Sequence, residues 1–470
     1  MPKPKRMKKP PLSPSFYYNS ISLRNFRGFK NSRSIPLAPL TFLVGPNSSG
    51  KSSIFDAILL IAQSELARID VEDRSPNWAG PLVDLGSFRD SVFRHDMALP
   101  IEIELGFHMD ETGLPWRSGR MSKSHKGQAI FSYSFKGSPH DQIGKLSRLA
   151  IRDPRTSAEV SFRYHRDGMH ARFLNQTRIW RPRGVRRRGR FEEWFSSFLS
   201  TAIKSSRISS AEKRAYRWLM KSTDTMSFNF FSFSTQRVSS GRSAPRRWYP
   251  ATDPRVQMES AFPKVYDSVD ASAIVQRRDD PYADFLEKSQ TGRHRSLRSV
   301  LRDLEIATDI RERKLSPYHT SIDIVDSITN VRSNLIDVGY GASQAIPVLQ
   351  AALSYSVGPL FIEQPEIHLH PRAQGALANI LCETSRHRQV VIETHSVHMI
   401  NRARILIAKG KLPPGNVMVL YVKRGRKGSR VRAIPILDNG DFGAPWPEGF
   451  FDERYEDTMQ LLSLKGDVGI

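Results

Sequence analysis

Residues 45–53 read GPNSSGKSS, and this stretch decides the fold. It fits the phosphate-binding loop pattern, which is a glycine, four residues of any kind, a second glycine, a lysine and then a serine or threonine. The residues at the fixed positions are Gly45, Gly50, Lys51 and Ser52. The pattern is specific only where a strand precedes it and a helix follows it, so the neighbouring residues decide how it is interpreted.

Both neighbours of this phosphate loop have the required character. The apolar run LTFLV at 40–44 predicts a short buried strand, and apolar residues recur at helical spacing through 53–67. Together they form an anion site, because backbone N–H groups turn inward and the helix dipole favours phosphate. In such a loop Lys51 reaches the β- and γ-phosphates of a nucleotide, and the Ser52 hydroxyl binds Mg²⁺. The other loop residues expected to bind the cofactor are Asn47, Ser48, Ser49 and Ser53.

The composition is that of a globular protein without disulfides. The chain has 470 residues, 39% of them hydrophobic, which is enough for two or three domains with a large core. A single cysteine, Cys382, excludes a disulfide framework and suits a reducing cytosol. No apolar run approaches the roughly 20 residues that cross a bilayer. The basic start of the chain has no apolar segment typical of a secretory signal, so we expect a cytoplasmic protein with no membrane partner.

The charge favours polyanionic partners. The net charge is +24, from 71 Lys and Arg against 47 Asp and Glu. The densest basic part, Arg178–Arg190, reads RIWRPRGVRRRGR and includes Trp180, which can stack on a base. We expect nucleic acid or another polyanion at this stretch. A solvated basic surface and a docking site for an acidic protein are the alternatives.

Changes of pattern along the chain predict five segments. Residues 1–18 form a basic tail, and residues 19–115 combine the phosphate loop with alternating apolar and polar runs typical of antiparallel strands. Residues 116–330 form an arginine-rich, mainly helical insertion. Residues 331–437 return to alternating strands and helices, and residues 438–470 form a C-terminal element.

Two apolar strands in the later part of the chain end in polar residues. The first, at 359–366, ends in acidic residues, and the second, at 388–396, ends in Thr394, His395 and Ser396. A glycine turn within 335–349 opens a helix before them. Strands that alternate with helices predict a parallel sheet whose ligand lies at the carboxyl ends of its strands.

The order of these motifs resembles the ABC-type ATPase heads of the RecF, SMC and OLD group. It is most similar to the OLD-like ATPases, which include the ATPase subunits of the PARIS and Septu anti-phage systems. The motifs that carry the resemblance are LRNFRGFK (23–30), LVGPNSSGKSS (43–53), DVGYGASQ (337–344), IEQPEIHLHP (362–371) and ETHS (393–396). The stretch 438–457 also resembles an element at the end of one subgroup of these proteins.

This resemblance implies a fold, cofactors and residue roles. The fold is an α/β ABC-type P-loop ATPase head, a mixed sheet with an antiparallel N-terminal lobe, and the cofactors are ATP and Mg²⁺. Gly341 and Ser343 would contact the nucleotide of a second subunit, so the heads would form a homodimer or a higher oligomer. Glu363 would bind Mg²⁺ together with Ser52, and His395 would contact the γ-phosphate.

One position departs from the pattern of ABC heads. The residue after the metal-associated acid is usually a glutamate that activates water, and here it is Gln364. An amide cannot accept a proton at neutral pH, although it can orient a water molecule. Either hydrolysis is slow, or Glu366 supplies the base. We therefore expect slow or partner-dependent ATPase activity.

Two classes of function are open at this point. In the first, the protein is the sensor and scaffold of an anti-phage complex and holds a separate effector, such as a nuclease. In the second, it is a RecF- or SMC-like ATPase that binds DNA during repair or maintenance. The acidic residues after 437 predict no nuclease fold, and we expect Trp446, Phe450 and Phe451 to pack on the head. A transporter ATPase is disfavoured, because the chain has no membrane segment.

Overall fold

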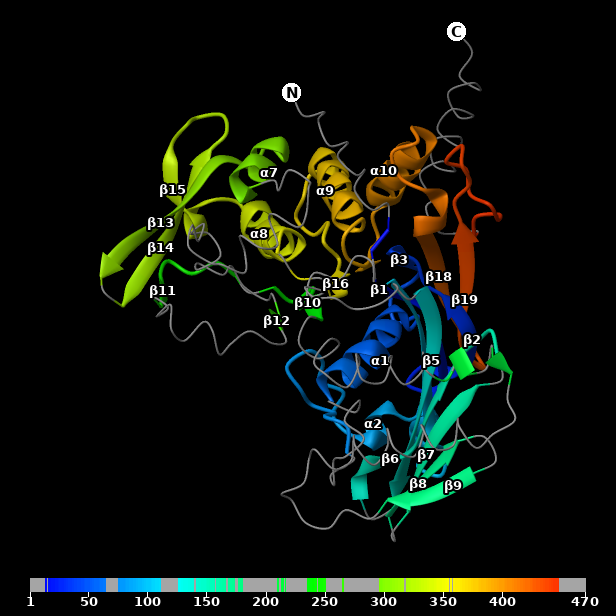
Figure 1. Cartoon of the computed structure of the whole chain (residues 1–470). Coiled ribbons are helices and arrows are strands. Elements are labelled where there is room, and N and C mark those ends of the chain that lie inside the picture. Colours follow the sequence, from blue (N-terminus) through cyan, green and yellow to red (C-terminus); the bar gives the residue numbers. More distant parts are fainter. Residues whose placement is uncertain are drawn as a thin grey trace, which may run out of the picture.

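The structure is a computed structural model, and Figure 1 shows the whole chain. It describes residues 13–14, 16–64, 75–110, 126–138, 141–156, 158–165, 168–173, 176–180, 209–210, 213–214, 216, 235–242, 244–250, 264–265, 296–316, 318–354, 356 and 358–447. The described residues form three β-sheets, with helices packed between and against them. The sequence motifs lie on the first two sheets.

The central sheet brings the ends of the motif-bearing strands to one edge. Its seven strands follow the order β12 (Lys264–Val265), β10 (Gln236–Val238), β16 (Leu360–Glu363), β17 (Val390–Glu393), β3 (Leu40–Val44), β18 (Val417–Gly425) and β19 (Gly428–Pro435). All neighbours are parallel except β18 and β19, which form an antiparallel hairpin. Glu363 lies beside Glu393, and Glu393 lies beside Leu43. Polar residues from distant parts of the chain therefore meet at the carboxyl edge, as expected of a ligand-binding parallel sheet.

Helices cover both faces of the central sheet. The helices α8 (Tyr340–Ala352), α9 (Pro371–Thr384) and α10 (Val397–Ala408) lie on one face, and α1 (Lys51–Gln63) lies on the other (Figure 1). β3 shows the division, because Phe42 and Val44 join the core under α8–α10 whereas Leu43 joins the core that contains α1. All five residues of β3 are buried, which explains its unbroken apolar run.

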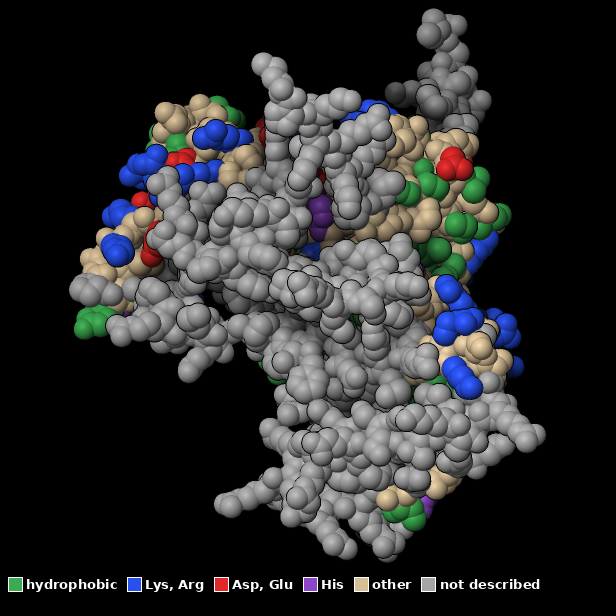
Figure 2. Space-filling view, in the orientation of Figure 1, with side chains coloured by type: hydrophobic (Ala, Val, Ile, Leu, Met, Phe, Trp, Pro, Cys, Tyr) green, Lys and Arg blue, Asp and Glu red, His purple; other side chains and the backbone are tan. Residues whose placement is uncertain are grey.

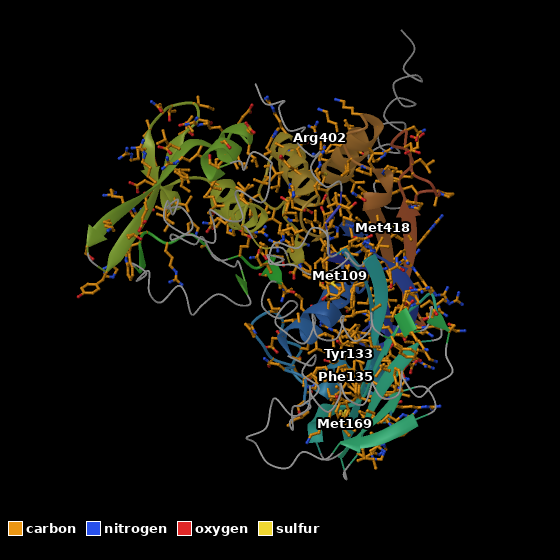
Figure 3. The ribbon with its side chains drawn as sticks, viewed as in Figure 1. Met109, Tyr133, Phe135, Met169, Arg402 and Met418 are labelled. Atoms are coloured by element: carbon orange, nitrogen blue, oxygen red, sulfur yellow. The ribbon has the colours of Figure 1, made fainter. Side chains whose placement is uncertain are left out.

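The second sheet is antiparallel and packs against the other side of α1. Its order is β2, β1, β4, β5, β6, β7, β8 and β9. The strands are β1 (Phe16–Phe26), β2 (Phe29–Pro36), β4 (Ile101–Asp110), β5 (Lys126–Ser138), β6 (Asp141–Arg152), β7 (Glu159–His165), β8 (Gly168–Phe173) and β9 (Gln176–Trp180). Figure 3 labels Met109, Tyr133, Phe135 and Met169 along this sheet, and all four are buried in one core with α1.

This sheet corrects the expected architecture of the insertion. β4 pairs directly with β5, so the sheet continues across the boundary expected at residue 116. Most of the described residues between 116 and 330 lie in strands, and the expectation of a mainly helical insertion is wrong for that part of the chain. Residues 129–135 and 160–164 alternate between apolar and polar, as is typical of strands, and they lie in β5 and β7. β8 also alternates, with Met169, Ala171 and Phe173 buried, whereas β9 has two adjacent apolar residues and shows no alternation.

A third, smaller sheet lies beside α8 (Figure 1). It consists of β11 (Tyr249–Pro250), β13 (Ala307–Ser316), β14 (His319–Asp326) and β15 (Arg332–Asn334), and α7 (Leu297–Asp303) packs on β13. α7 lies inside the segment 116–330, which the sequence predicts to be mainly helical. The remaining short helices are α2 (Phe88–Ser91), η1 (Phe93–His95), η5 (Leu335–Asp337) and η6 (Pro414–Asn416).

The described part of the C-terminal element packs on α10, as the sequence predicts. The ring centroids of Phe442 and Trp446 are 4.4 Å apart, and the Arg404 guanidinium lies 4.2 Å from the Phe442 ring. Arg404 Nε also donates to the carbonyl of Gly440 at 2.7 Å. Phe450 and Phe451 lie outside the described residues. In the part of the chain that the structure describes, no helix is both long and apolar enough to cross a membrane.

Candidate functional site

The phosphate loop joins β3 to α1 and is held in shape by the β18–β19 hairpin. Gly45 has a φ of 137°, and a Cβ there would lie 2.1 Å from the carbonyl oxygen of Val422, so this position requires glycine. Gly50 precedes α1 with a φ of 103°. The Ser429 hydroxyl of the hairpin donates to the carbonyl of Ser49 at 2.6 Å. The protein's own packing therefore fixes the conformation of the loop.

Lys51 is buried at the start of α1, with its ammonium group inside the loop. Its Nζ donates to the carbonyl of Gly45 at 3.0 Å and to that of Pro46 at 2.9 Å. Oε1 of Glu393 lies 3.7 Å from the same nitrogen. Burial lowers the pKa of Lys51, and the neighbouring Glu393 carboxylate opposes this change. The lysine thus presents a positive charge in a loop whose geometry suits phosphate.

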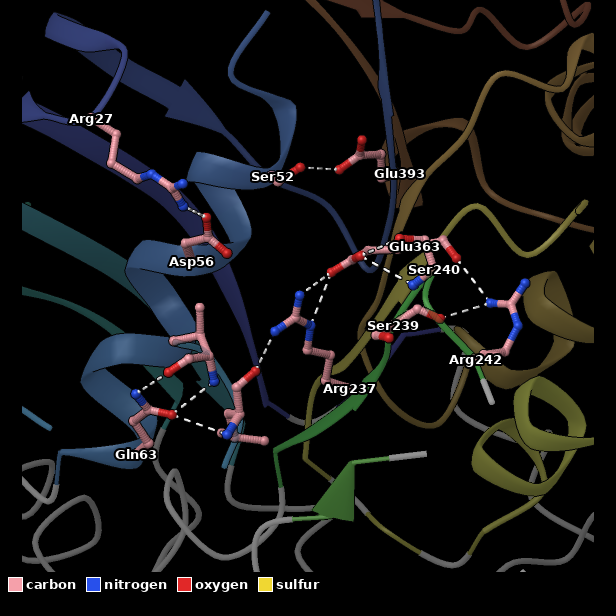
Figure 4. A network of polar contacts seen from close by, with 12 residues as sticks. Arg27, Ser52, Asp56, Gln63, Arg237, Ser239, Ser240, Arg242, Glu363 and Glu393 are labelled. Atoms are coloured by element: carbon pink, nitrogen blue, oxygen red, sulfur yellow. Dashed lines mark hydrogen bonds and ion pairs between the residues drawn. The ribbon is translucent and has the colours of Figure 1, made fainter. Parts of the chain in front are cut away.

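Ser52 hydrogen-bonds to Glu393, the acid at the end of β17. Ser52 is exposed, and its hydroxyl donates to Oε2 of Glu393 at 2.8 Å (Figure 4). No hydrogen bond joins Ser52 to Glu363 among the described residues, and the expected role of these two residues at Mg²⁺ stays a prediction. The sheet explains the contact with Glu393, because β17 lies between β3 and β16 and brings Glu393 one strand closer to the loop. Burial raises the pKa of Glu393, and its Ser52 and Lys51 neighbours oppose this shift.

Glu363, at the end of β16, is bound by the segment that contains and follows β10. Its Oε1 accepts hydrogen bonds from Arg237 Nε at 2.9 Å and Arg237 Nη2 at 2.5 Å. Its Oε2 accepts from the Ser240 backbone N–H at 3.1 Å and the Ser240 hydroxyl at 3.0 Å. Arg237 also donates to the carbonyl of Leu82 at 2.5 Å (Figure 4). Both carboxylate oxygens therefore have protein donors, and Arg237 balances the charge.

Arg242 is a buried arginine that joins α8 to the end of β16. Its Nε donates to Oε1 of Gln344 on α8 at 3.2 Å. Nη1 donates to the carbonyls of Ser239 at 3.0 Å and Glu363 at 3.1 Å, and Nη2 donates to that of Gln364 at 3.0 Å. Figure 4 shows this side chain facing the carboxyl edge of the sheet. One guanidinium thus connects the two segments that resemble nucleotide-contacting motifs.

The turn after β16 contacts the turn after β17. Gln364 has a left-handed φ of 42°, and its N–H donates to the carbonyl of Glu393 at 2.7 Å. Oε1 of Glu366 accepts the backbone N–H of His395 at 2.6 Å. Burial raises the pKa of Glu366 and lowers that of His395. The structure therefore gathers all four expected catalytic residues at this edge, namely Glu363, Gln364, Glu366 and His395.

The start of α8 carries the two residues expected to contact a second subunit. A Cβ at Gly341 would lie 2.8 Å from the carbonyl oxygen of His368, so glycine allows α8 to approach the turn after β16. Ser343 is buried, and its hydroxyl donates to the carbonyl of Tyr340 at 2.9 Å. The expected contact of Gly341 and Ser343 with the nucleotide of a second subunit stays a prediction. Tyr340 is the side chain exposed at this terminus.

Sequence reasoning missed Arg237, Ser240 and Arg242 as site residues. The loop at 239–248 is recognisable only as arginine-rich, and β10 has three residues, too few to show a periodic pattern. No signal in the sequence relates this loop to β16, because the strand before the loop, β10, pairs with β16 across more than a hundred residues. Beyond the backbone of β9, the basic stretch Arg178–Arg190 lies outside the described residues, and its expected role stays a prediction.

The β18–β19 hairpin carries a basic surface that the sequence analysis did not single out. Its exposed basic residues are Lys423, Arg424, Arg426, Lys427, Arg430 and Arg432. Figure 2 shows Lys and Arg side chains gathered at the right, where β19 lies in Figure 1. No acidic residue occurs between Glu393 and Asp438 in the sequence, so nothing within the hairpin balances this charge.

Three protein-family models match the chain. Residues 17–134 match an AAA ATPase domain. Residues 195–401 match the model described as "AAA domain, putative AbiEii toxin, Type IV TA system". Two stretches of the chain are thus similar to AAA-type ATPase domains. The first match includes the phosphate loop, and the second includes β16, β17 and their polar ends. Residues 412–461 match a protein of unknown function (DUF3696). No curated protein matches the sequence.

Solved structures similar to this chain include SMC heads. One is the SmcHead bound to the C-winged helix domain of ScpA, with 12% identity and a TM-score of 0.45, covering 89% of this chain and 98% of that one. Another is the SMC head domain from Thermotoga maritima, with 11% identity and a TM-score of 0.35, covering 89% and 99%. Similarity this low adds nothing to what the sheets themselves show. The strand order of this chain's central sheet, with the phosphate loop between β3 and α1, confirms the expected α/β fold of an ABC-type P-loop head.

Proposed function

We propose that this chain binds and hydrolyses ATP as an ABC-type head. The observation that carries the proposal is the position of Lys51 and Ser52 beside the polar ends of β16 and β17. A buried ammonium group and the N-terminus of a 13-residue helix favour phosphates. Hydroxyl and carboxylate oxygens are ligands that Mg²⁺ prefers, so the donor set fits this metal. When bound, Mg²⁺ would neutralise charge on the phosphates.

The residues of the site have distinct proposed roles. Lys51 holds the β- and γ-phosphates, and the backbone of the phosphate loop surrounds them. His395 contacts the γ-phosphate, and Gln364 orients the attacking water. Because an amide cannot accept the proton, Glu366 is the proposed acceptor, and turnover is slow or depends on a partner. The raised pKa of Glu366 supports this role, since a better base accepts a proton more readily.

Equilibrium binding of ATP tests this proposal directly. Lys51→Ala removes a charge-assisted contact worth about 1.5–3 kcal/mol, so we expect affinity to fall roughly 10- to 100-fold. Lys409→Ala changes an exposed lysine at the end of α10 and should leave affinity unchanged. If the wild-type protein does not bind ATP, or if Lys51→Ala binds it as tightly, the proposal fails.

The proposed biological role is that of sensor and scaffold in a prokaryotic anti-phage complex. ATP-bound heads would associate and hold a separate effector, such as a nuclease, until a phage signal releases it. The motif resemblance supports this role, as does the family match at residues 195–401, whose description names a toxin of a type IV TA system. The test is the mass in solution with ATP and Mg²⁺ after co-expression with the genomic neighbours. An assembly that contains a neighbour in the wild type but not in Lys51→Ala is expected, and a lone monomer or dimer in both would contradict it.

The basic hairpin favours a second candidate, an ATPase that binds nucleic acid. The hairpin that carries these exposed basic residues also contacts the phosphate loop, through the hydrogen bond from Ser429 to Ser49. Phosphate backbones bind such a surface with an affinity that falls steeply with salt. Tight, salt-sensitive DNA binding that ATP strengthens would support this candidate over the scaffold. Binding that is weak and indifferent to ATP would remove it.

A further inference from the structure

The β18–β19 hairpin combines a dense positive charge with a direct contact to the phosphate loop (Figure 2). We propose that this hairpin, together with Lys30 and Arg94, forms a surface that binds the phosphate backbone of duplex nucleic acid and is coupled to the phosphate loop through Ser429. The surface deepens the second candidate function, and it rests on the proposed function only for the nucleotide at the phosphate loop. Its charge, its frame, its buried aromatic rings and its contact with the loop each support it.

The charge of this surface is not neutralised by neighbouring acids. The hairpin contributes six exposed basic residues, and Lys30 and Arg94 are also exposed, which makes eight in all. Among the residues that the structure describes, none of these eight side chains forms a salt bridge. On the third sheet, by contrast, Arg311 and Arg313 are each paired with an aspartate. Cations gathered without partners repel one another, and a polyanion relieves that repulsion.

The strands of the hairpin aim part of this charge in one direction. Lys423 pairs directly with Arg430, and Arg432 follows two residues along β19, so these three side chains share one face of the hairpin. The intervening residues face the other way, and there Ser429 is buried and Val431 packs against the core that contains α1. The hairpin therefore holds its cations on a rigid frame.

The turn of the hairpin adds further cations and is held by two other segments. Arg426 and Lys427 form its two-residue turn, where asparagine and glycine are the residues that turn geometry favours. Arg94 Nη2 donates to the carbonyl of Arg426 at 3.1 Å, from a backbone with a left-handed φ of 56°. A Cβ at Gly428 would lie 3.2 Å from the backbone nitrogen of Lys30. Three segments that are distant in the sequence thus form one continuous basic surface.

The aromatic rings of these segments favour a duplex over a single strand. Phe93 is 8% exposed and Tyr421 is 7% exposed, so neither offers a face to a base. Single-stranded nucleic acid binds largely through bases that stack on exposed aromatic side chains. A duplex hides its bases and presents one negative charge per roughly 1.7 Å of its axis, twice the density of one strand. A surface that offers cations without stacking platforms therefore fits a duplex backbone.

Ser429 connects this surface to the phosphate loop. Its hydroxyl donates to the carbonyl of Ser49 at 2.6 Å, and its N–H donates to the carbonyl of Gly28 at 2.7 Å. A Cβ at Gly50 would lie only 2.9 Å from the same hydroxyl. The hairpin therefore has little room to move without the loop residues that precede Lys51. Coupling between two ligands is reciprocal, so ATP should tighten duplex binding by the same factor as the duplex tightens ATP binding.

Fluorescence anisotropy with a labelled DNA duplex of mixed sequence tests the surface. The full-length protein is titrated at several salt concentrations. Arg426→Gln combined with Lys427→Gln removes two phosphate contacts at an exposed turn, so duplex affinity should fall roughly 10- to 30-fold, and the slope of log affinity against log salt should fall by about 2. Lys409→Gln combined with Lys411→Gln is the matched control, because it removes two exposed lysines after α10 and should change neither quantity.

Other ligands decide what the surface recognises. A single strand of the same sequence should bind more weakly than the duplex, and vesicles that contain phosphatidylserine should not bind at the same salt. An RNA duplex identifies the source, since equal affinity means that only the shared phosphate backbone is recognised, and a preference names DNA or RNA. The proposal is overturned if the wild type binds no duplex, if it prefers the single strand or the vesicles, or if the turn variant binds the duplex as the control does. Arg430→Gln combined with Arg432→Gln removes two charges from the same surface if the turn variant does not fold.

The coupling has its own readout, the ratio of duplex affinities measured with saturating ATP and without nucleotide. This ratio should be about 5 to 10 in the wild type, and Ser429→Ala should bring it close to 1. Because ATP is saturating, a change in ATP affinity alone does not alter the ratio. A ratio that Ser429→Ala leaves at the wild-type value overturns the coupling. A wild type that binds the duplex but not ATP refutes the proposed function, whereas one that binds ATP but no duplex refutes this surface alone.

Discussion

Replacing Arg242 with methionine tests whether the polar network at the sheet edge holds the site together. Methionine fills a similar volume but donates no hydrogen bonds. The change removes four hydrogen bonds at once, to Gln344, Ser239, Glu363 and Gln364. Arg242 is almost fully buried, at 7% exposure, so water does not readily reach the four acceptors that would lose their donor.

The contacts of Arg242 give the size of the effect. Each hydrogen bond from a charged donor contributes about 1.5–3 kcal/mol. The cost of burying the guanidinium offsets several kcal/mol of the total, so we expect a net loss of about 3–5 kcal/mol in the free energy of unfolding. For a chain of 470 residues, unfolding entropy makes each kcal/mol worth about 1 °C in Tm. Thermal denaturation of Arg242→Met should therefore show Tm lower by roughly 3–5 °C.

Two further variants make this result interpretable. Arg247→Met changes an arginine of the same loop whose ion pair with Asp337 is exposed, and its Tm should stay within about 1 °C of wild type. Arg242→Lys keeps the charge and some of the donors, so its Tm should lie between those of wild type and Arg242→Met. An Arg242→Met protein as stable as the Arg247→Met control would refute the reasoning.

Three other predictions concern turnover, pH and the phosphate loop. Gln364→Glu supplies a carboxylate where ABC heads have one, and phosphate release should rise at least about tenfold; unchanged release would mean that Gln364 does not limit turnover. Burial raises the pKa of Asp56 from 3.8 to about 6 despite its ion pair with Arg27. Ionising this carboxyl in the folded protein is therefore unfavourable, and the free energy of unfolding should fall by about 3 kcal/mol as pH rises from below 4 to above 6. Asp56→Asn should therefore flatten the fall in unfolding free energy between pH 4 and 6 in denaturant titrations, and an unchanged slope would contradict it. Gly45→Ala would collide with the carbonyl of Val422, so we expect a lower Tm and loss of ATP binding; wild-type binding would show that the loop adapts.

The sequence predicts the central sheet well because its strands are buried on both faces. The run at 40–44 is apolar except for Thr41, and the apolar stretches 360–362 and 390–392 are each followed by polar residues. Such runs are typical of parallel strands under helices. The strands between 126 and 180 are less evident because one face of each is polar, and basic residues interrupt the alternation.

The partners of the site residues were beyond the reach of the sequence. Motifs identify Lys51 and Glu363 as functional residues, but not which side chains contact them. The contact of Ser52 with Glu393 depends on the order of the strands, which no local pattern specifies. Arg237 reaches Glu363 only because β10 pairs with β16 across a long insertion. Local patterns therefore predict the residue types of the site, and the topology decides their pairing.

The contacts of Glu363 connect the two lobes of the head. Through Arg237 its side chain is linked to the carbonyl of Leu82 beside the antiparallel lobe, and through Arg242 its backbone is linked to Gln344 on α8. If these contacts are energetically coupled, a movement of β16 on nucleotide binding would also move the residues that they contact in both lobes. A double-mutant cycle with Arg237→Met and Arg242→Met measures this directly, and we expect a coupling energy of about 0.5–3 kcal/mol. Strictly additive effects would mean that the two arginines stabilise their lobes independently, and that Glu363 does not relay the state of the site.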